Sequence, residues 1–241
     1  MNKSCLSLTN IEKTIGSKKI LSKISFSVEK NEIVGLLGPN GAGKTTAFYI
    51  AAGLMFPNQG KILIKNKDVT NKPMHARANL GLGYLPQESS LFPDLSVEDN
   101  LFGITELLKH DREHKIKNVA KIIDEFNLTK ILQIKGRMLS GGQRRKVEIA
   151  RTLICEPKIM LLDEPFAGID PIAVEEIKEL LLEITKKNIS ILITDHNVRE
   201  TLNLCNKAII LSNGMVIAEG NEESLKQNAH VKNEYFGRMF S

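Results

Sequence analysis

The 241-residue sequence contains no tryptophan, only three tyrosines and only three cysteines. Because Cys5, Cys155 and Cys205 lie far apart and form no C-x-x-C pair, we expect neither a disulfide framework nor a cysteine-based zinc site, and free buried thiols in a reducing compartment fit best. No apolar run approaches the ~18 residues needed to cross a bilayer, which excludes a transmembrane helix. The N-terminus also lacks the apolar stretch of a signal peptide, so we expect a protein of the cytosol.

Long runs of like charge are missing as well. The sequence has 33 Lys and Arg residues against 28 Asp and Glu residues, and the resulting formal net charge of +5 is spread along the chain. This spread indicates a mildly basic, solvated surface and gives little support for nucleic-acid binding. The composition, with 42% hydrophobic and 25% charged residues, excludes a disordered or fibrous protein, and the length fits one large domain or one core with a smaller subdomain.

Short apolar runs alternate with helical patterns through most of the sequence, which favours an α/β fold. Segments 6–8 and 24–28 alternate apolar with polar residues, as half-buried antiparallel strands do, and segment 61–64 continues this pattern. Nearly continuous apolar runs, which indicate strands buried on both faces, occur at 33–37, 159–162, 190–194 and 208–211. We therefore predict a mainly parallel core with an antiparallel β layer at its N-terminal edge.

A helical block interrupts this core. Between Val97 and Leu132 the apolar residues recur at spacings of three and four, as in Ile116, Val119, Ile122, Ile123 and Phe126. A further helix is predicted over 171–186. The expected organisation is an α/β core of residues 1–87 and 140–220, an inserted α-helical subdomain of residues 88–139, and a weakly periodic tail of residues 221–241.

The phosphate-binding pattern G-x-x-x-x-G-K-[ST] is matched in full by Gly38-Pro39-Asn40-Gly41-Ala42-Gly43-Lys44-Thr45. It directly follows a predicted strand and precedes a helical stretch that begins at Thr46. Thr46 is also a predicted phosphate contact. The glycines allow backbone N–H groups to turn toward phosphate oxygens, and the helix N-terminus adds its positive dipole. Lys44 supplies a cation for the β- and γ-phosphates, and the Thr45 hydroxyl ligates Mg²⁺. A glycine-rich turn without a ligand is the alternative.

The apolar strand 159–162 ends in two carboxylates, Asp163 and Glu164. Two acidic residues after a strand are commonly only a helix cap or a turn, but downstream of a phosphate-binding loop they indicate a catalytic pair. Asp163 can hold Mg²⁺ through a water molecule opposite Thr45, and Glu164 can activate the attacking water.

A second anion-binding helix start is predicted at Leu139-Ser140-Gly141-Gly142-Gln143, because its serine hydroxyl and glycine amides open a helix. An LSGGQ sequence between a phosphate-binding loop and an Asp-Glu strand resembles the ATP-binding cassette (ABC) family. In that family two cassettes pair head to tail, and each ATP lies between the loop of one and the LSGGQ of the other. The resemblance implies a P-loop NTPase (RecA-like) core, ATP and Mg²⁺ as ligands, and a homodimer in which Ser140, Gly141, Gly142 and Gln143 act across the interface.

The other family motifs are present too. Tyr84-Leu85-Pro86-Gln87-Glu88 resembles the Q-loop, Ala167-Gly168-Ile169-Asp170 the D-loop, and Thr194-Asp195-His196 the switch region. The resemblance implies that Gln87 ligates Mg²⁺ and senses the lytic water, and that His196 contacts the γ-phosphate. Many members stack adenine on an aromatic residue, and the matching position here is Ile15, which would hold the base by apolar contact instead.

Two histidines stand outside these motifs. His110 and His114 are four positions apart and have the spacing of a metal-binding pair. The sequence offers no third ligand nearby, so a solvated helix face is the preferred interpretation.

Within the family, the sequence is similar to the ATPases of lipopolysaccharide exporters, most specifically at 83–92, 164–171, 193–202 and 230–237. The similarity implies a homodimer bound beneath two integral-membrane subunits on the cytoplasmic face of the inner membrane, with the lipopolysaccharide handled by the complex and not by this chain. An ATPase of a branched-chain amino-acid importer is the alternative. A soluble ABC ATPase that acts on nucleic acid is less favoured, because such proteins usually carry a long insertion or two cassettes.

Phe92 is the predicted contact to a membrane partner. In Leu91-Phe92-Pro93 it follows the Q-loop directly, and a large apolar side chain at this place can form part of a groove for a short partner helix. A core position inside the helical subdomain is an equally weighted alternative.

Overall fold

The computed structural model describes residues 4–237, so the first three residues and residues 238–241 of the predicted tail lie outside the described part. A six-stranded sheet with the order β10-β9-β3-β8-β7-β6 forms the centre of the molecule. The strands from β9 to β6 run parallel, and β10 pairs with β9 antiparallel. The strands are β3 (Ile33–Leu37), β6 (Leu82–Leu85), β7 (Ile159–Asp163), β8 (Ser190–Thr194), β9 (Lys207–Ser212) and β10 (Met215–Gly220).

Burial explains why the core strands are so apolar. Every residue of β3, β7 and β8 is buried, because other layers of the protein cover both faces of the central sheet. The predicted mainly parallel core is therefore confirmed. Strands β6 and β10 at the two edges of the sheet are additions that the sequence analysis did not identify.

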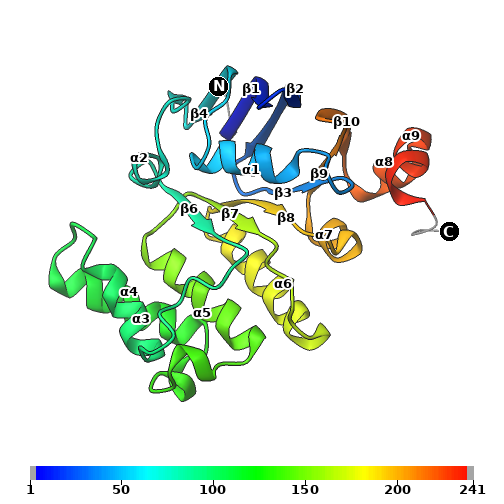
Figure 1. Cartoon of the computed structure of the whole chain (residues 1–241). Helices are drawn as coiled ribbons and strands as arrows, with labels where there is room; N and C mark the ends of the chain where they lie inside the picture. The colour runs from blue at the N-terminus through cyan, green and yellow to red at the C-terminus, as the bar shows by residue number, and fades with distance from the viewer. Residues whose placement is uncertain (1–3, 238–241) are drawn as a thin grey trace.

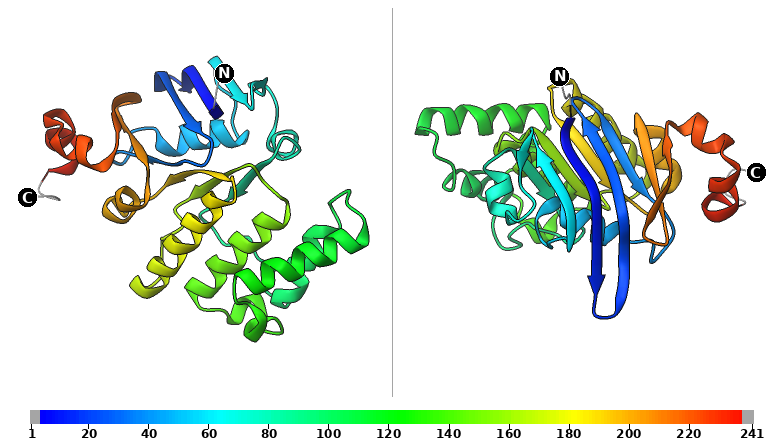
Figure 2. Two further views of the ribbon diagram at one scale, coloured as in Figure 1. Left: turned by 180° about the vertical axis from the view of Figure 1, so that it is seen from behind. Right: turned by 90° about the horizontal axis from the view of Figure 1, so that it is seen from above.

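An antiparallel sheet with the order β2-β1-β4-β5 forms a separate layer. Its strands are β1 (Ser4–Ile15), β2 (Lys18–Glu29), β4 (Gln59–Ile64) and β5 (Lys67–Asp68). Leu6 and Leu8 are buried and lie opposite Val28 and Phe26 of β2, so the predicted alternation and the predicted β layer are confirmed. The ends of β1 and β2 form a hairpin that extends beyond the rest of the sheet (Figure 2).

Helix α1 (Lys44–Ala52) lies between the two sheets (Figure 1), and its apolar side chains pack in one hydrophobic core with both of them. Its last turn is held by the fully buried Arg77 of α2 (Met74–Ala78). The Arg77 guanidinium donates hydrogen bonds to the carbonyl oxygens of Ile50 at 2.6 Å and Ala51 at 2.8 Å. A cation at a helix C-terminus offsets the negative end of the helix dipole, so Arg77 fixes the helix that begins with Lys44.

Helices α5 (Gly141–Ile154) and α6 (Pro171–Lys186) lie against the other face of the central sheet (Figure 1). Helices α3 (Val97–Thr105) and α4 (Arg112–Glu125) pack on α5, further from the sheet, and 3₁₀ turns follow at Thr129–Ile131 and Gly136–Met138. The predicted helical block is thus two helices with a break at 106–111. Val119, Ile122 and Phe126 are buried as their spacing indicated, whereas Ile116 is exposed.

The C-terminal part packs around α7 (Val198–Leu204), whose Leu202 shares a small core with Leu225 and Val231 of the tail. The tail contains α8 (Glu222–Gln227), α9 (Ala229–Val231) and a π-helical turn (Lys232–Phe236). Within residues 4–237, no helix has the length and apolarity that a bilayer crossing requires.

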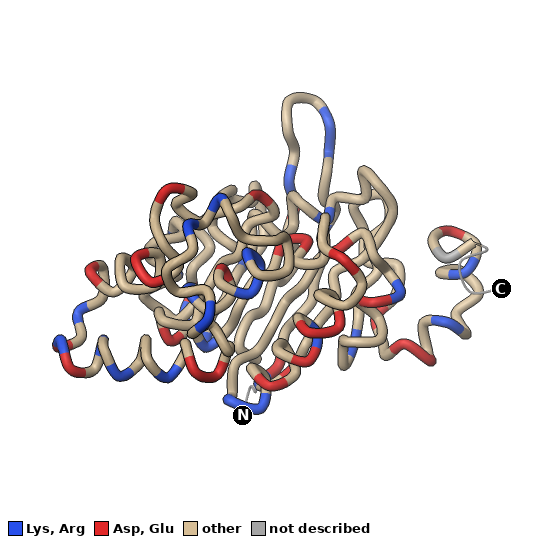
Figure 3. The backbone as a smooth tube through the Cα atoms, turned by 90° about the horizontal axis from the view of Figure 1, so that it is seen from below, with Lys and Arg blue, Asp and Glu red and all other residues tan. Residues whose placement is uncertain are grey.

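Two surface predictions can be compared with the structure. Lys, Arg, Asp and Glu are interspersed along the described chain, in agreement with the expected spread of charge (Figure 3). The three cysteines are free, and Cys5 is buried as expected. The prediction of a buried thiol is wrong for Cys155, which is exposed because it ends helix α5 at the surface.

Candidate nucleotide site

The strand order brings the sequence motifs together. The neighbouring parallel strands β3, β8, β7 and β6 are followed by the phosphate-binding loop, His196, Glu164 and Gln87, respectively. Because the carboxyl ends of parallel strands share one edge of a sheet, these segments lie in a row. The strand order therefore forms the site from residues that are distributed along the sequence between Gly38 and His196.

The loop before α1 is built to receive an anion. Lys44 is buried, and its Nζ donates hydrogen bonds to the carbonyl oxygens of Gly38 at 2.6 Å and Pro39 at 3.0 Å. Burial lowers the pKa of this ammonium group, and the Glu164 carboxylate partly opposes that shift. Helix α1 has no side-chain cap, because Gly43 stands at its N-cap in the left-handed region. A buried cation and uncapped amides are the donor set that phosphate oxygens require, so the residues present fit a nucleotide phosphate chain.

Glu164 is held between the other two predicted catalytic residues. Gln87 Nε2 donates a hydrogen bond of 2.7 Å to Glu164 Oε2, and His196 Nε2 lies 2.8 Å from Glu164 Oε1. The backbone of Glu164 adopts a left-handed conformation with φ 48°, a region uncommon for residues other than glycine. The structure thus brings Gln87, Glu164 and His196 together, as the sequence predicted for their motifs.

Asp163 lies at the end of β7 and is buried. Desolvation by burial, together with the negative charge of Glu164, raises the pKa of Asp163 to about 6. The Tyr84 hydroxyl donates a weak hydrogen bond of 3.4 Å to Asp163 Oδ2. A buried carboxylate with so little compensation is well suited to a cation, so Asp163 and the Thr45 hydroxyl fit a magnesium site by their oxygen chemistry.

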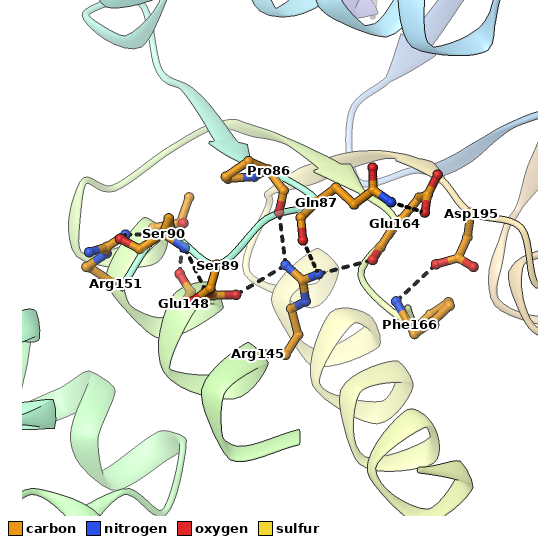
Figure 4. Close-up of polar contacts among 11 residues, drawn as sticks. Pro86, Gln87, Ser89, Ser90, Arg145, Glu148, Arg151, Glu164, Phe166 and Asp195 are labelled. Atoms are coloured by element: carbon orange, nitrogen blue, oxygen red, sulfur yellow. Dashed lines mark hydrogen bonds and ion pairs between the residues drawn. The ribbon is translucent and has the colours of Figure 1, made fainter. Parts of the chain in front are cut away.

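Arg145 in the second turn of α5 fixes the backbone around these carboxylates (Figure 4). Its guanidinium donates hydrogen bonds to the carbonyl oxygens of Pro86 at 3.0 Å, Gln87 at 3.3 Å and Glu164 at 3.1 Å. The same group pairs with the buried Glu148 at 3.2 Å. Arg145 could not be identified from the sequence, because it stands in a basic run whose neighbours are more exposed.

Glu148 extends this network toward the segment after Gln87. Its Oε1 accepts hydrogen bonds from the Ser89 hydroxyl at 2.8 Å and the Ser90 backbone N–H at 2.9 Å. Arg151, one turn further along α5, donates to the Ser90 carbonyl oxygen at 2.7 Å and to its hydroxyl at 2.6 Å. One face of α5 therefore holds the whole segment from Pro86 to Ser90.

A cavity of about 280 Å³ opens beside Lys44. It is lined by Lys18, Ile20, Asn40, Gly41, Gly43, Lys44, Thr45, Thr46, Glu164, Thr194 and His196. Ile15 is not in this lining but lies half exposed at the end of β1, so its contact with adenine stays a prediction. Ile20 on β2 is an apolar candidate for the base that the sequence analysis missed.

Comparison with known proteins agrees with the nucleotide site described above. A family model described as ABC transporter matches residues 21–167. The chain belongs to the ABC transporter family. It therefore binds ATP and is an ATP-hydrolysing subunit of a transporter system. The predicted fold and the predicted ATPase activity are both confirmed by this membership.

Three ABC proteins show how far the similarity reaches. The chain is 48% identical to the "Lipopolysaccharide export system ATP-binding protein LptB" of Haemophilus influenzae, and the alignment covers 98% of this chain and 99% of that protein. A solved ABC transporter cassette in its ADP conformation superposes with a TM-score of 0.89 at 30% identity, covering 98% of this chain and 100% of the other. A dimeric cassette in a post-hydrolysis state, bound to ADP and Pi, superposes with a TM-score of 0.76 at 25% identity, with 90% and 98% coverage.

The LSGGQ segment of this ABC protein lies apart from its own phosphate-binding loop. Ser140 is the N-cap of α5 and forms a capping box with Gln143. Gly141 lines a cavity of about 260 Å³ that also includes Gln87 and Gly168 but none of the residues from Gly38 to Thr46. Within one chain, the two predicted anion-binding elements therefore do not face the same cavity.

Phe92 is presented at the surface of the cassette. Its side chain is 61% exposed, which decides against the core alternative. The buried Asn100 of α3 fixes its backbone, because Asn100 Oδ1 accepts from the Phe92 N–H at 2.8 Å and Asn100 Nδ2 donates to the Phe92 carbonyl oxygen at 3.1 Å. Phe92 lines an apolar cavity of about 510 Å³ together with Tyr84, Ile104 and Leu107.

Proposed function

We propose that this chain is the ATPase subunit of a lipopolysaccharide exporter and powers the extraction of lipopolysaccharide from the inner membrane. The observation that carries the proposal is the similarity over nearly the full length to a protein named for that export system. The complex would comprise a homodimer of this chain on the cytoplasmic face of the membrane and two integral-membrane subunits, which contact the lipopolysaccharide. Nucleic acid has no part in this function.

The substrate of transport is tested through the partners. We expect that pull-down of the chain from native membranes recovers two integral-membrane subunits, and that ATP turnover of the purified complex responds to lipopolysaccharide. Recovery of subunits that bind branched-chain amino acids would replace the proposal by the importer alternative. Tight binding to nucleic acid with a steep salt dependence would replace it by the soluble alternative.

The nucleotide is bound by residues of the phosphate-binding loop. Lys44 and the amides at the start of α1 hold the phosphate oxygens, in place of the Gly38 and Pro39 carbonyls that Lys44 contacts in this structure. Thr45, Gln87 and Asp163 would hold Mg²⁺, which offsets the charge that develops on the phosphates. The proposed adenine contact is apolar and comes from the β1–β2 side, with Ile15 or Ile20.

Glu164 is the proposed general base. It accepts a proton from the attacking water at a carboxylate oxygen, and the hydrogen bond from Gln87 and the contact with His196 fix the orientation of that carboxylate. His196 would contact the γ-phosphate once the nucleotide is bound, which its position beside Glu164 and in the lining of the cavity supports. Gln87, Glu164 and His196 thus act as one unit.

The active form is proposed to be a dimer. Ser140, Gly141, Gly142 and Gln143 do not line the cavity beside Lys44 of their own chain, so they are free to contact the nucleotide of a partner cassette. The similarity to a dimeric cassette with ADP and Pi supports this arrangement. Residues 88–139 would move as a subdomain when the dimer closes.

The test of this mechanism is Glu164→Gln, which keeps the size of the side chain and removes the base. We expect unchanged ATP binding, a loss of turnover of about 10²–10⁴-fold, and accumulation of a closed dimer with ATP. Glu183→Gln on the exposed surface of α6 is the matched control and should leave turnover unchanged. Near-normal turnover of Glu164→Gln would remove Glu164 from the base role.

The apolar cavity beside Phe92 is the proposed binding site for a short helix of the membrane subunit. Its opening is rimmed by apolar side chains, and the Phe92 backbone is fixed by Asn100, so the groove is preformed. Phe92→Ala should fold and hydrolyse ATP but assemble poorly with the membrane subunits in size-exclusion chromatography. Met215→Ala, which truncates a comparably exposed side chain on β10, should assemble normally. Unaltered assembly of Phe92→Ala would contradict the groove.

A further inference from the structure

A group of metal-ligating side chains lies outside the nucleotide site. His110, His114 and Glu156 each offer one ligand atom, and these atoms all lie within 4.8 Å of one another. No other such group of three or more His, Cys, Asp or Glu residues occurs in the part of the chain that the structure describes. The expectation that the histidine pair has no third ligand is wrong, because Glu156 approaches from 42 positions beyond His114.

Both imidazoles face the same carboxylate. His114 Nε2 lies 2.7 Å from Glu156 Oε1, and His110 Nε2 lies 4.0 Å from Glu156 Oε2. Tetrahedral zinc with bonds of about 2.0–2.2 Å places its ligand atoms about 3.3 Å apart. The observed separations bracket this value, and all three side chains are exposed enough to adjust, with exposed fractions of 46%, 44% and 42%.

The two imidazole rings lie side by side at this carboxylate. The ring centroids of His110 and His114 are 4.5 Å apart, with planes inclined by 33°. A divalent cation bound to two neutral imidazoles and the carboxylate satisfies all three groups at once.

The backbone positions His114 and Glu156 independently of one another. His114 is in the first turn of α4, where its N–H donates to the N-cap Asp111 at 2.9 Å. Glu156 follows the last turn of α5 with φ 51°, in the left-handed conformation that glycine usually takes at a helix end. Its N–H donates to the Leu153 carbonyl oxygen at 2.8 Å, so the direction of the Glu156 side chain is set by the end of α5.

We propose that His110, His114 and Glu156 bind one divalent transition-metal ion of the zinc type, with water completing the coordination. Two imidazoles and one carboxylate are ligands that suit zinc, whereas Mg²⁺ prefers oxygen ligands alone. The ion joins the start of α4 to the segment between α5 and β7. Cys155, which lines the apolar cavity of Phe92, directly precedes Glu156, and Leu107, which also lines it, lies three positions before His110; the ion would therefore stabilise one side of that cavity.

The test is a zinc titration by calorimetry on the full chain, purified without a histidine tag, in excess Mg²⁺ and without nucleotide. We expect one Zn²⁺ per chain and an affinity that falls at least about tenfold in His114→Ala and in Glu156→Gln. His75→Ala and His230→Ala are the control variants and should leave the affinity unchanged. Cobalt in place of zinc should give visible absorption bands without a thiolate charge-transfer band.

Three results would overturn the proposal. They are no zinc binding, a zinc affinity of His114→Ala and Glu156→Gln equal to that of the unmodified chain, or loss of binding in Cys155→Ser, which would assign the metal to the neighbouring thiol. Folding of each variant is monitored by circular dichroism. The proposal does not depend on lipopolysaccharide export, because zinc affinity is measured on the isolated chain.

Discussion

The pair formed by Arg145 and Glu148 offers the sharpest test of how the site is held together. Both side chains are almost fully buried, at 5% and 2% exposed, and Arg145 also donates to the carbonyl oxygens of Pro86, Gln87 and Glu164. Arg145→Met keeps much of the side-chain volume but leaves Glu148 as a buried charge whose remaining donors are Ser89 and Ser90. Breaking one half of a buried ion pair costs about 3–5 kcal/mol of unfolding free energy.

A second consequence of Arg145→Met concerns catalysis. The carbonyl groups of Gln87 and Glu164 lose the donor that fixes them, so the backbone from which the Gln87 and Glu164 side chains meet becomes less constrained. We expect kcat to fall while ATP binding at Lys44 persists, because the phosphate-binding loop makes no contact with Arg145 among the hydrogen bonds described.

The measurement is urea unfolding followed by circular dichroism, combined with a double-mutant cycle. Glu148→Gln should cost less than Arg145→Met, because a neutral amide still accepts from Ser89 and Ser90. The coupling energy between the two substitutions is expected at about 1–3 kcal/mol. Lys146→Met is the control on the same helix; Lys146 lies 3.9 Å from the exposed Glu176, and its loss should cost less than about 1 kcal/mol. A cost below about 1 kcal/mol for Arg145→Met, or a coupling energy near zero, would refute the reasoning.

Three further predictions concern the phosphate-binding loop and its surroundings. Without nucleotide and Mg²⁺, the pKa of Asp163 is raised from 3.8 to about 6, so the folded state retains a proton that the unfolded chain loses. The free energy of unfolding, measured in urea, should therefore fall as the pH rises from about 4 to about 6. Asp163→Asn should make the stability depend less on pH over this range. Gly38→Ala should destabilise the chain by more than about 1 kcal/mol, because φ of Gly38 is +150° and an added Cβ would meet the Leu211 carbonyl oxygen. Gly103→Ala in α3 is the control: an added Cβ meets no atom there, so the substitution should stabilise the chain by about 0.5–1 kcal/mol. Lys44→Ala should lose most of its affinity for a fluorescent ATP analogue, because the phosphates lose their buried cation, and retained affinity would contradict that role.

Local patterns sufficed for much of the fold. The helix predicted over 171–186 has the bounds of α6, because Pro171 follows an Asp170 N-cap and the apolar residues keep one face. The motif residues could be located because the phosphate-binding loop and the Asp-Glu pair each depend on a short contiguous segment. Their assembly followed from the rule that parallel strands place their carboxyl ends at one edge.

Interactions that depend on tertiary packing could not be predicted in this way. Arg145 stands between Arg144 and Lys146, and only the packing of α5 shows which of the three points into the protein. Arg77 resembles a surface residue by type but is fully buried, because the end of α1 supplies its acceptors. Glu156 reaches the histidine pair only through the turn after α5, so the sequence separation concealed it.

Helix α5 connects the LSGGQ segment at its N-terminus to the segment beside Phe92 near its C-terminus. Its 14 residues, at about 1.5 Å each, make a rod about 20 Å long, with Ser140 at one end and Arg151 near the other. A tilt of about 5° around Arg151, about 16 Å from Ser140 along the helix, would move Ser140 by about 1.4 Å, more than a hydrogen bond can stretch before it breaks. A small displacement beside Phe92 would thus be larger at the opposite end of the helix, which in the proposed dimer faces the second cassette.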